Sequence, residues 1–105
     1  MAEDDEALIR KFPMSAANMQ RIVREIARDT SRIIVLSHAL ERAAKRGVSR
    51  RQIERCCQLG TIVEGPFANK FGNWQANFYR HAAGGEMTCS VAVDLKNRVL
   101  IITVF

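Results

Sequence analysis

Apolar residues in the first half of the chain recur at the spacing of an α-helix. Between Ser15 and Arg28 they recur at i, i+3, i+4, i+7 and i+8, which places them on one side of a helix that can bury them. These residues are Met19, Ile22, Val23, Ile26 and Ala27. The Ser15 side chain can accept a hydrogen bond from the first turn, so we expect the helix to begin at Ala16.

The next apolar run is short and rich in β-branched residues. Residues 33–36 read Ile-Ile-Val-Leu, which predicts a buried strand rather than a helix. Ser37 can then cap a second helix over residues 38–46, and Gly47 can end it in the left-handed conformation.

A third helix follows after a very short connection. Ser49 and Gln52 have the spacing of a capping box, in which each side chain bonds the main chain of the other residue. Gly60 marks the expected end of this helix. Two short helices joined by residues 47–49 predict a helical hairpin.

Beyond Gly60 the pattern changes to the two-residue period of β-strands. We predict strands over residues 61–64, 74–80, 87–95 and 99–105. The turn signals between them are Gly65-Pro66, Gly84-Gly85 and Lys96-Asn97. Strands joined by short turns pair antiparallel. The fold class is therefore α+β: an N-terminal helix, then a strand, a helical hairpin and an antiparallel sheet of four to five strands.

Chain length and composition bound the organisation. A chain of 105 residues holds one core, so we expect a flexible tail over residues 1–14 and a single domain over residues 15–105. No apolar run approaches the roughly 20 residues needed to span a membrane. The acidic N-terminus differs from a secretory signal, so we expect a cytoplasmic protein. The three cysteines, two adjacent and one distant, predict buried reduced thiols and no zinc site.

The charge is unevenly distributed along the chain. The net charge is +5, but four of the eleven acidic residues lie within the first six positions. Most of the basic excess lies between Arg10 and Arg55. A basic surface favours a polyanionic partner, above all nucleic acid, although many basic domains have no such partner.

Candidate chemistry lies on the second helix and on one strand. His38, Arg42 and Arg46 are spaced four residues apart, so they share one side of that helix. Arginine suits phosphate and histidine titrates near neutrality, so the three can bind and cleave a phosphodiester. A solvated helix face is the alternative. Tyr79 and His81 fall on the polar face of the strand over residues 74–80 and form a second, weaker candidate group.

Several segments in register resemble the family called domain of unknown function 4258. They are Ser-His-Ala-Leu-Glu-Arg at 37–42, Arg-Gly-Val-Ser at 46–49, Ile53, Gly-Thr-Ile-Val-Glu at 60–64 and the closing strand 99–105. The similarity covers about residues 32–105. It implies a fold like that of the RelE toxin and related ribonucleases, with a strand, a helical hairpin and an antiparallel sheet.

The same resemblance implies roles for individual residues. The family pattern marks four positions, which are His38, Arg42, Arg46 and Thr103. In related ribonucleases, basic side chains with His or Tyr cleave RNA without a metal ion, by attack of the 2′-hydroxyl on the adjacent phosphate. By analogy His38 is the general base or acid, and the arginines, with Arg80, stabilise the charged phosphorane.

Other parts of the site follow less directly from the resemblance. No family pattern aligns over residues 67–73, so His81 or Tyr79 would have to act as the second proton-transfer group. Arg80, Tyr79 and Arg50 are the predicted substrate-binding residues, and no metal or cofactor is expected.

The predicted function is a metal-independent ribonuclease of the toxin type that acts on RNA. A neutralising antitoxin or immunity protein is the expected partner. Two alternatives are a non-catalytic nucleic-acid-binding module and an interaction domain whose partner docks on an exposed strand edge.

Overall fold

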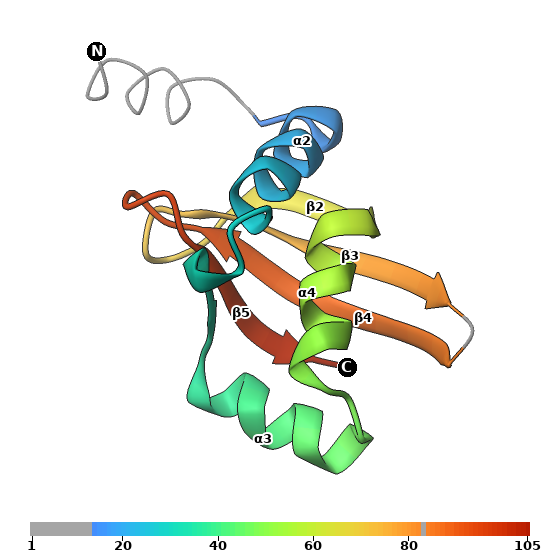
Figure 1. The fold of residues 1–105 in the computed structure, drawn as a ribbon. Helices are drawn as coiled ribbons and strands as arrows, with labels where there is room; N and C mark the ends of the chain where they lie inside the picture. The colour runs from blue at the N-terminus through green and yellow to red at the C-terminus, as the bar shows by residue number, and fades with distance from the viewer. Residues whose placement is uncertain (1–13, 83) are drawn as a thin grey trace.

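The computed structural model describes residues 14–82 and 84–105, and helices precede a run of strands (Figure 1). In chain order the elements are α2 (Ala16–Ala27), a 3₁₀ helix η1 (Thr30–Arg32), β1 (Ile33–Val35), α3 (Ser37–Arg46), α4 (Arg50–Leu59), β2 (Thr61–Ala68), β3 (Trp74–Ala82), β4 (Gly85–Val93) and β5 (Val99–Val104). The predicted α+β class and element order are confirmed. The tail predicted over residues 1–14 lies outside the described residues, apart from Met14.

The five strands form one sheet in the order β1-β5-β4-β3-β2. The last four strands pair antiparallel, as their short turns predict. β1 instead runs parallel to β5, with Ile33 opposite Val99. The helical hairpin and three strands separate β1 from β5 along the chain, which gives room for the long connection that a parallel pair needs. The sheet is therefore mixed rather than wholly antiparallel.

β2 is longer than the sequence pattern predicts. The strand was expected to end before Gly65-Pro66, but it continues to Ala68 with two register shifts against β3. The Gly65–Pro66 peptide bond is cis. β2 is an edge strand, where the missing N–H of a proline need not cost a ladder hydrogen bond.

The helix ends agree with the predicted caps at all junctions but one. Ser15 accepts a hydrogen bond from Asn18 N at 3.0 Å, and Ser49 forms the complete capping box at the start of α4. Ser37 is not a cap, because α3 begins at Ser37 itself and Leu36 occupies the cap position without a side-chain hydrogen bond. The strand therefore ends and the helix begins one residue earlier than expected, although Leu36 N still donates a hydrogen bond to Ile101 O of β5. None of the helices in the described ranges is long and apolar enough to cross a membrane.

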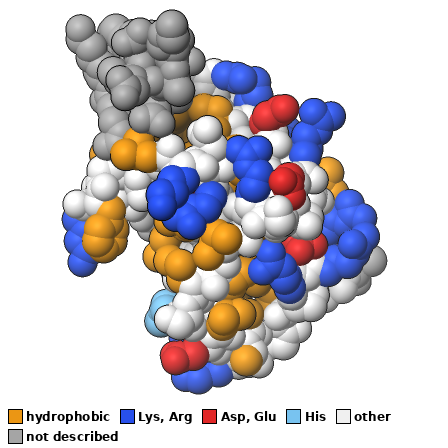
Figure 2. Space-filling view, turned by 60° about the vertical axis from the view of Figure 1, so that its left-hand side comes forward, with side chains coloured by type: hydrophobic (Ala, Val, Ile, Leu, Met, Phe, Trp, Pro, Cys, Tyr) orange, Lys and Arg blue, Asp and Glu red, His pale blue; other side chains and the backbone are white. Residues whose placement is uncertain are grey.

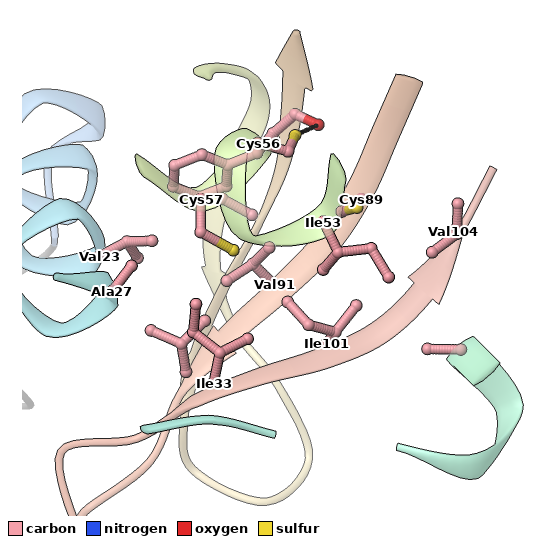
Figure 3. Packing of buried hydrophobic residues seen from close by; sticks show 14 of the residues in the cluster. Val23, Ala27, Ile33, Ile53, Cys56, Cys57, Cys89, Val91, Ile101 and Val104 are labelled. Carbon is pink, nitrogen blue, oxygen red and sulfur yellow. Dashed lines mark hydrogen bonds between the residues drawn. The ribbon is translucent and has the colours of Figure 1, made fainter. Parts of the chain in front are cut away.

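The core lies between the helices and one face of the sheet. Figure 3 shows Val23 of α2 and Cys57 of α4 among apolar side chains of the strands, including Val91 and Ile101. The predicted stripe of α2 is buried, except that Ile22 is only partly covered. All three cysteines are buried and unpaired, as predicted.

The two faces of β3 differ as their alternation predicts. Ala76 and Phe78 are buried on the face that α2 and α4 cover. The other face carries polar side chains that bridge strands, such as Gln75 Nε2, which donates to Ser90 Oγ at 2.7 Å. Among the described residues, no helix covers that second face (Figure 1).

Gly60 joins α4 to β2 at a point where two main-chain carbonyl groups approach it. A Cβ atom there would lie 2.9 Å from the carbonyl oxygen of Tyr79 and still closer to that of Cys56. Only glycine fits this junction without a shift of the main chain.

Candidate nucleic-acid interface

A hollow of about 140 Å³ lies between the α3–α4 connection and the hairpin of β3 and β4. Its charged and polar lining residues are Arg46, Gln52, Arg80 and Glu86, and its apolar ones include Val48 and Met87. We call it the Arg46–Arg80 hollow. It brings together two of the predicted site residues that lie far apart in the sequence.

Local structure explains why Arg46 faces this hollow. Arg46 is the last residue of α3, and Gly47 ends the helix in the left-handed conformation at φ 65°. The capping box of Ser49 and Gln52 then starts α4 within three residues. This short, doubly capped connection fixes the end of α3 against the start of α4.

Arg80 reaches the hollow from the sheet. By strict alternation it lies on the same face of β3 as Phe78, and it is paired with Met87 of β4. Its side chain is half-buried where the helix-covered face ends near the hairpin. Neither the Arg80 nor the Arg46 side chain forms a hydrogen bond or an ion pair with any residue that the structure describes.

A second polar group lies at the same end of the hairpin. Tyr79 Oη donates a hydrogen bond to Glu86 Oε2 at 2.6 Å, and this bond raises the pKa of the Tyr79 hydroxyl. His81 is exposed and lies directly opposite Glu86 in the register of β3 and β4. Glu86 also lines the hollow, but Tyr79 and His81 do not: by the alternation of β3 they lie on the sheet face opposite that of Arg80.

Sequence reasoning missed Glu86 and Gln52 as site residues. Gln52 was assigned only to the capping box, where its Oε1 does accept a hydrogen bond from Ser49 N at 2.7 Å. Glu86 follows Gly84-Gly85 directly, and a tight hairpin at these glycines would have placed it opposite His81.

His38, Arg42 and Thr103 do not line the hollow. His38 is exposed in the first turn of α3, eight residues and therefore about 12 Å along the helix axis from Arg46. Arg42 Nε donates to Val104 O at 3.4 Å, so this arginine holds α3 against β5. Thr103 is opposite Ser90, on the sheet face that no described helix covers.

Arg50, a predicted substrate-binding residue, is engaged inside the protein. Its Nη2 donates to the carbonyl oxygens of Thr30 and Ile33, and its Nε pairs with Glu54 at 3.0 Å. The guanidinium thereby ties the start of α4 to the start of β1.

Basic side chains are spread rather than concentrated in one patch. On the face in Figure 2, Lys and Arg side chains form separate groups with acidic side chains between them. Within residues 14–82 and 84–105, no group of three or more His, Cys, Asp and Glu side chains is arranged to hold a metal ion.

A family model for a domain of unknown function, DUF4258, matches residues 35–105. The chain belongs to this family. The DUF4258 match begins at the end of β1, so α2 and η1 lie outside it. No curated protein and no solved structure matches the chain. The likeness to RelE therefore stays a prediction from sequence.

Proposed function

We propose that this DUF4258 domain binds RNA at the Arg46–Arg80 hollow and cleaves it without a metal ion. One observation carries the proposal: two arginines from distant segments line the same hollow, and neither has an acidic partner among the described residues. A guanidinium offers planar donors that match a phosphate, and two of them can hold one phosphate from two sides.

The chemistry requires proton transfer in addition to charge. The 2′-oxygen forms a bond to phosphorus while the bond from phosphorus to the 5′-oxygen breaks. A base takes the proton of the 2′-hydroxyl, and an acid gives one to the 5′-oxygen. We assign the base to Glu86, which lines the hollow, and the acid to His81, which lies opposite Glu86 in the strand register but is not itself a lining residue of the hollow. Arg46 and Arg80 stabilise the charge that develops on the phosphorane.

A second candidate function is RNA binding without cleavage. It is favoured by the position of His38, the histidine that the family pattern marks, which lies outside the hollow. In this case the two arginines would hold RNA, and no general base or acid would be needed.

A ribonuclease of the toxin type would damage RNA in the cell that makes it. We therefore include in the proposal a neutralising protein partner, which would cover the Arg46–Arg80 hollow, and a site of action in the cytoplasm, where the RNA is.

The experiment is to incubate the purified protein with labelled RNA in the presence of EDTA. We expect cleavage that leaves cyclic phosphate ends. Arg46→Ala and Arg80→Ala should weaken both binding and cleavage, whereas Lys45→Ala, next to Arg46 but outside the hollow, should change neither.

Two further variants separate the candidate functions. Glu86→Gln and His81→Ala should bind RNA as the native protein does but cleave it about 100-fold or more slowly. Binding without cleavage by the native protein would favour the second candidate. Absence of binding at low salt would overturn both.

A further inference from the structure

Several arginines on the outside of the helical layer have no acidic partner. The side chains of Arg21 in α2 and of Arg51 and Arg55 in α4 form no ion pair or hydrogen bond with any described residue. The two acids of these helices, Glu25 and Glu54, are already paired with Arg28 and Arg50. Arg21, Arg51 and Arg55 therefore have no ion pair of their own among the described residues, although Glu25 and Glu54 lie near them.

These arginines continue from the Arg46–Arg80 hollow along α4. Gln52, near the start of α4, lines the hollow. Arg51 and Arg55 are one turn apart on the side of α4 opposite the buried Ile53. The helix has ten residues and is about 15 Å long, and the two arginines occupy about 6 Å of it, next to its hollow end.

The far end of α4 meets α2. Arg24 Nη2 donates to Gly60 O at 3.1 Å, and Gln58 Nε2 donates to Ala27 O at 3.0 Å, so the two helices are tied together where α4 ends. The exposed Arg21 lies one turn before Arg24 in α2, on the helix that this contact joins to the end of α4.

We propose that α4 and α2 form a phosphate-binding path that holds the part of an RNA chain lying outside the Arg46–Arg80 hollow. This inference rests on the proposed function and specifies its substrate: an RNA several nucleotides longer than the hollow alone can hold. The path binds backbone phosphates through Arg51, Arg55 and Arg21. It is indifferent to base sequence, because phosphate contacts carry no sequence information.

In this proposal α2 contributes Arg21 to the phosphate-binding path. It lies outside the residues that the DUF4258 model matches, so its contribution is an addition to the family unit. We expect Arg21→Ala to weaken the binding of long RNA alone.

The test compares a trinucleotide with an unstructured RNA of about fifteen nucleotides, a length in the range that single-strand-binding surfaces cover. The double variant Arg51→Ala/Arg55→Ala should bind the long RNA about tenfold more weakly at low salt. The slope of log affinity against log salt should fall by about 0.7 for each phosphate that the variant no longer neutralises. Its affinity for the trinucleotide should not change.

The matched control is Lys45→Ala/Lys96→Ala, which removes the same charge from exposed positions off the path. It should bind both RNAs as the native protein does. If the double variant unfolds, Arg51→Glu alone at an exposed position provides the same comparison and should weaken long RNA more than Arg51→Ala.

Other outcomes decide against the path. Equal binding of long RNA by the native and Arg51→Ala/Arg55→Ala proteins would overturn the proposed path. The proposed function would still stand in that case if Arg46→Ala failed to bind the trinucleotide. Equal weakening by the charge-matched control would also overturn the path. So would arginine-dependent binding to vesicles of anionic lipid with no arginine-dependent binding to RNA.

Discussion

Arg50 Nη2 donates a hydrogen bond to the main-chain carbonyl oxygen of Ile33 at 2.8 Å. The same nitrogen also bonds Thr30 O at 3.0 Å. Arg50 begins α4 and Ile33 begins β1, so one side chain connects the helical hairpin to the edge strand of the sheet. This arginine therefore contributes to the fold, whereas Arg46, at the end of the preceding helix, is left free.

The role of Arg50 can be measured as stability. Arg50→Lys keeps the charge but loses the planar fork that bonds two carbonyl oxygens, so we expect the free energy of unfolding to fall by about 1–2 kcal/mol. Urea unfolding measures this change. Arg51→Lys, at the exposed neighbouring position without a partner, should change stability by less than about 0.5 kcal/mol. Equal effects of the two substitutions would contradict the bridging role.

The Tyr79–Glu86 pair can be followed by absorbance, since Tyr79 is the only tyrosine. Its hydrogen bond to the Glu86 carboxylate raises the pKa of the hydroxyl, so ionisation should occur above the usual value of about 10. Glu86→Gln removes the negative charge and should lower the midpoint of the titration. Glu64→Gln, on the neighbouring strand β2, should leave it unchanged. An unaltered midpoint in Glu86→Gln would mean that the pair does not form in solution.

Asp94 should make stability depend on acid pH. Burial raises the pKa of its carboxyl, but hydrogen bonds from Arg98 and the Arg98 charge outweigh this, so the pKa lies below its usual value. Such a carboxylate contributes stability above its unfolded pKa of about 3.9, and the contribution is lost as the pH falls through the lower, folded pKa. We expect Asp94→Asn to show a smaller decrease of unfolding free energy below about pH 4 than native protein. Glu41→Gln serves as the control, and full acid dependence in Asp94→Asn would refute the assignment.

The three thiols should be inaccessible in the folded protein. Cys56, Cys57 and Cys89 have no exposed surface, and burial raises the pKa of the Cys57 thiol. A thiol reagent should therefore react slowly with the native protein, at a rate limited by local opening of the structure. In denaturant it should react rapidly with all three thiols. Rapid reaction of even one thiol without denaturant would show that the core is more open than the structure indicates.

Local signals in the sequence predicted most of the fold. Ser15, Gly47 and the Ser49–Gln52 box each act within a few residues, and all three mark the helix ends correctly. The failures involve long-range contacts. Ser37 is not a cap because the pairing of β1 with β5 ends at Val35 and α3 begins at Ser37 itself. β2 continues through Pro66, which an edge strand tolerates.

The candidate site was harder to predict for the same reason. Helical spacing placed His38 and Arg46 on one side of α3, but only tertiary packing determines that Arg46 alone reaches the hollow. Glu86 has no distinguishing motif, and its place beside Tyr79 follows from the register of two strands. Arg50 looked like a free cation in the sequence, since carbonyl acceptors in η1 and β1 leave no trace in the residue pattern.

Gly60 has a consequence for recognising distant relatives of this protein. The carbonyl oxygens of Cys56 and Tyr79 leave no room for a side chain, so any chain that keeps this helix-to-strand junction must keep glycine there, whatever its chemistry. Arg46 is exposed and Arg80 is half-buried, and neither side chain forms an ion pair with a described residue, so neither position has the steric requirement of Gly60. In a remote sequence, glycine at this junction would therefore indicate inherited architecture, while the pair of arginines would indicate that the RNA site we propose is also inherited.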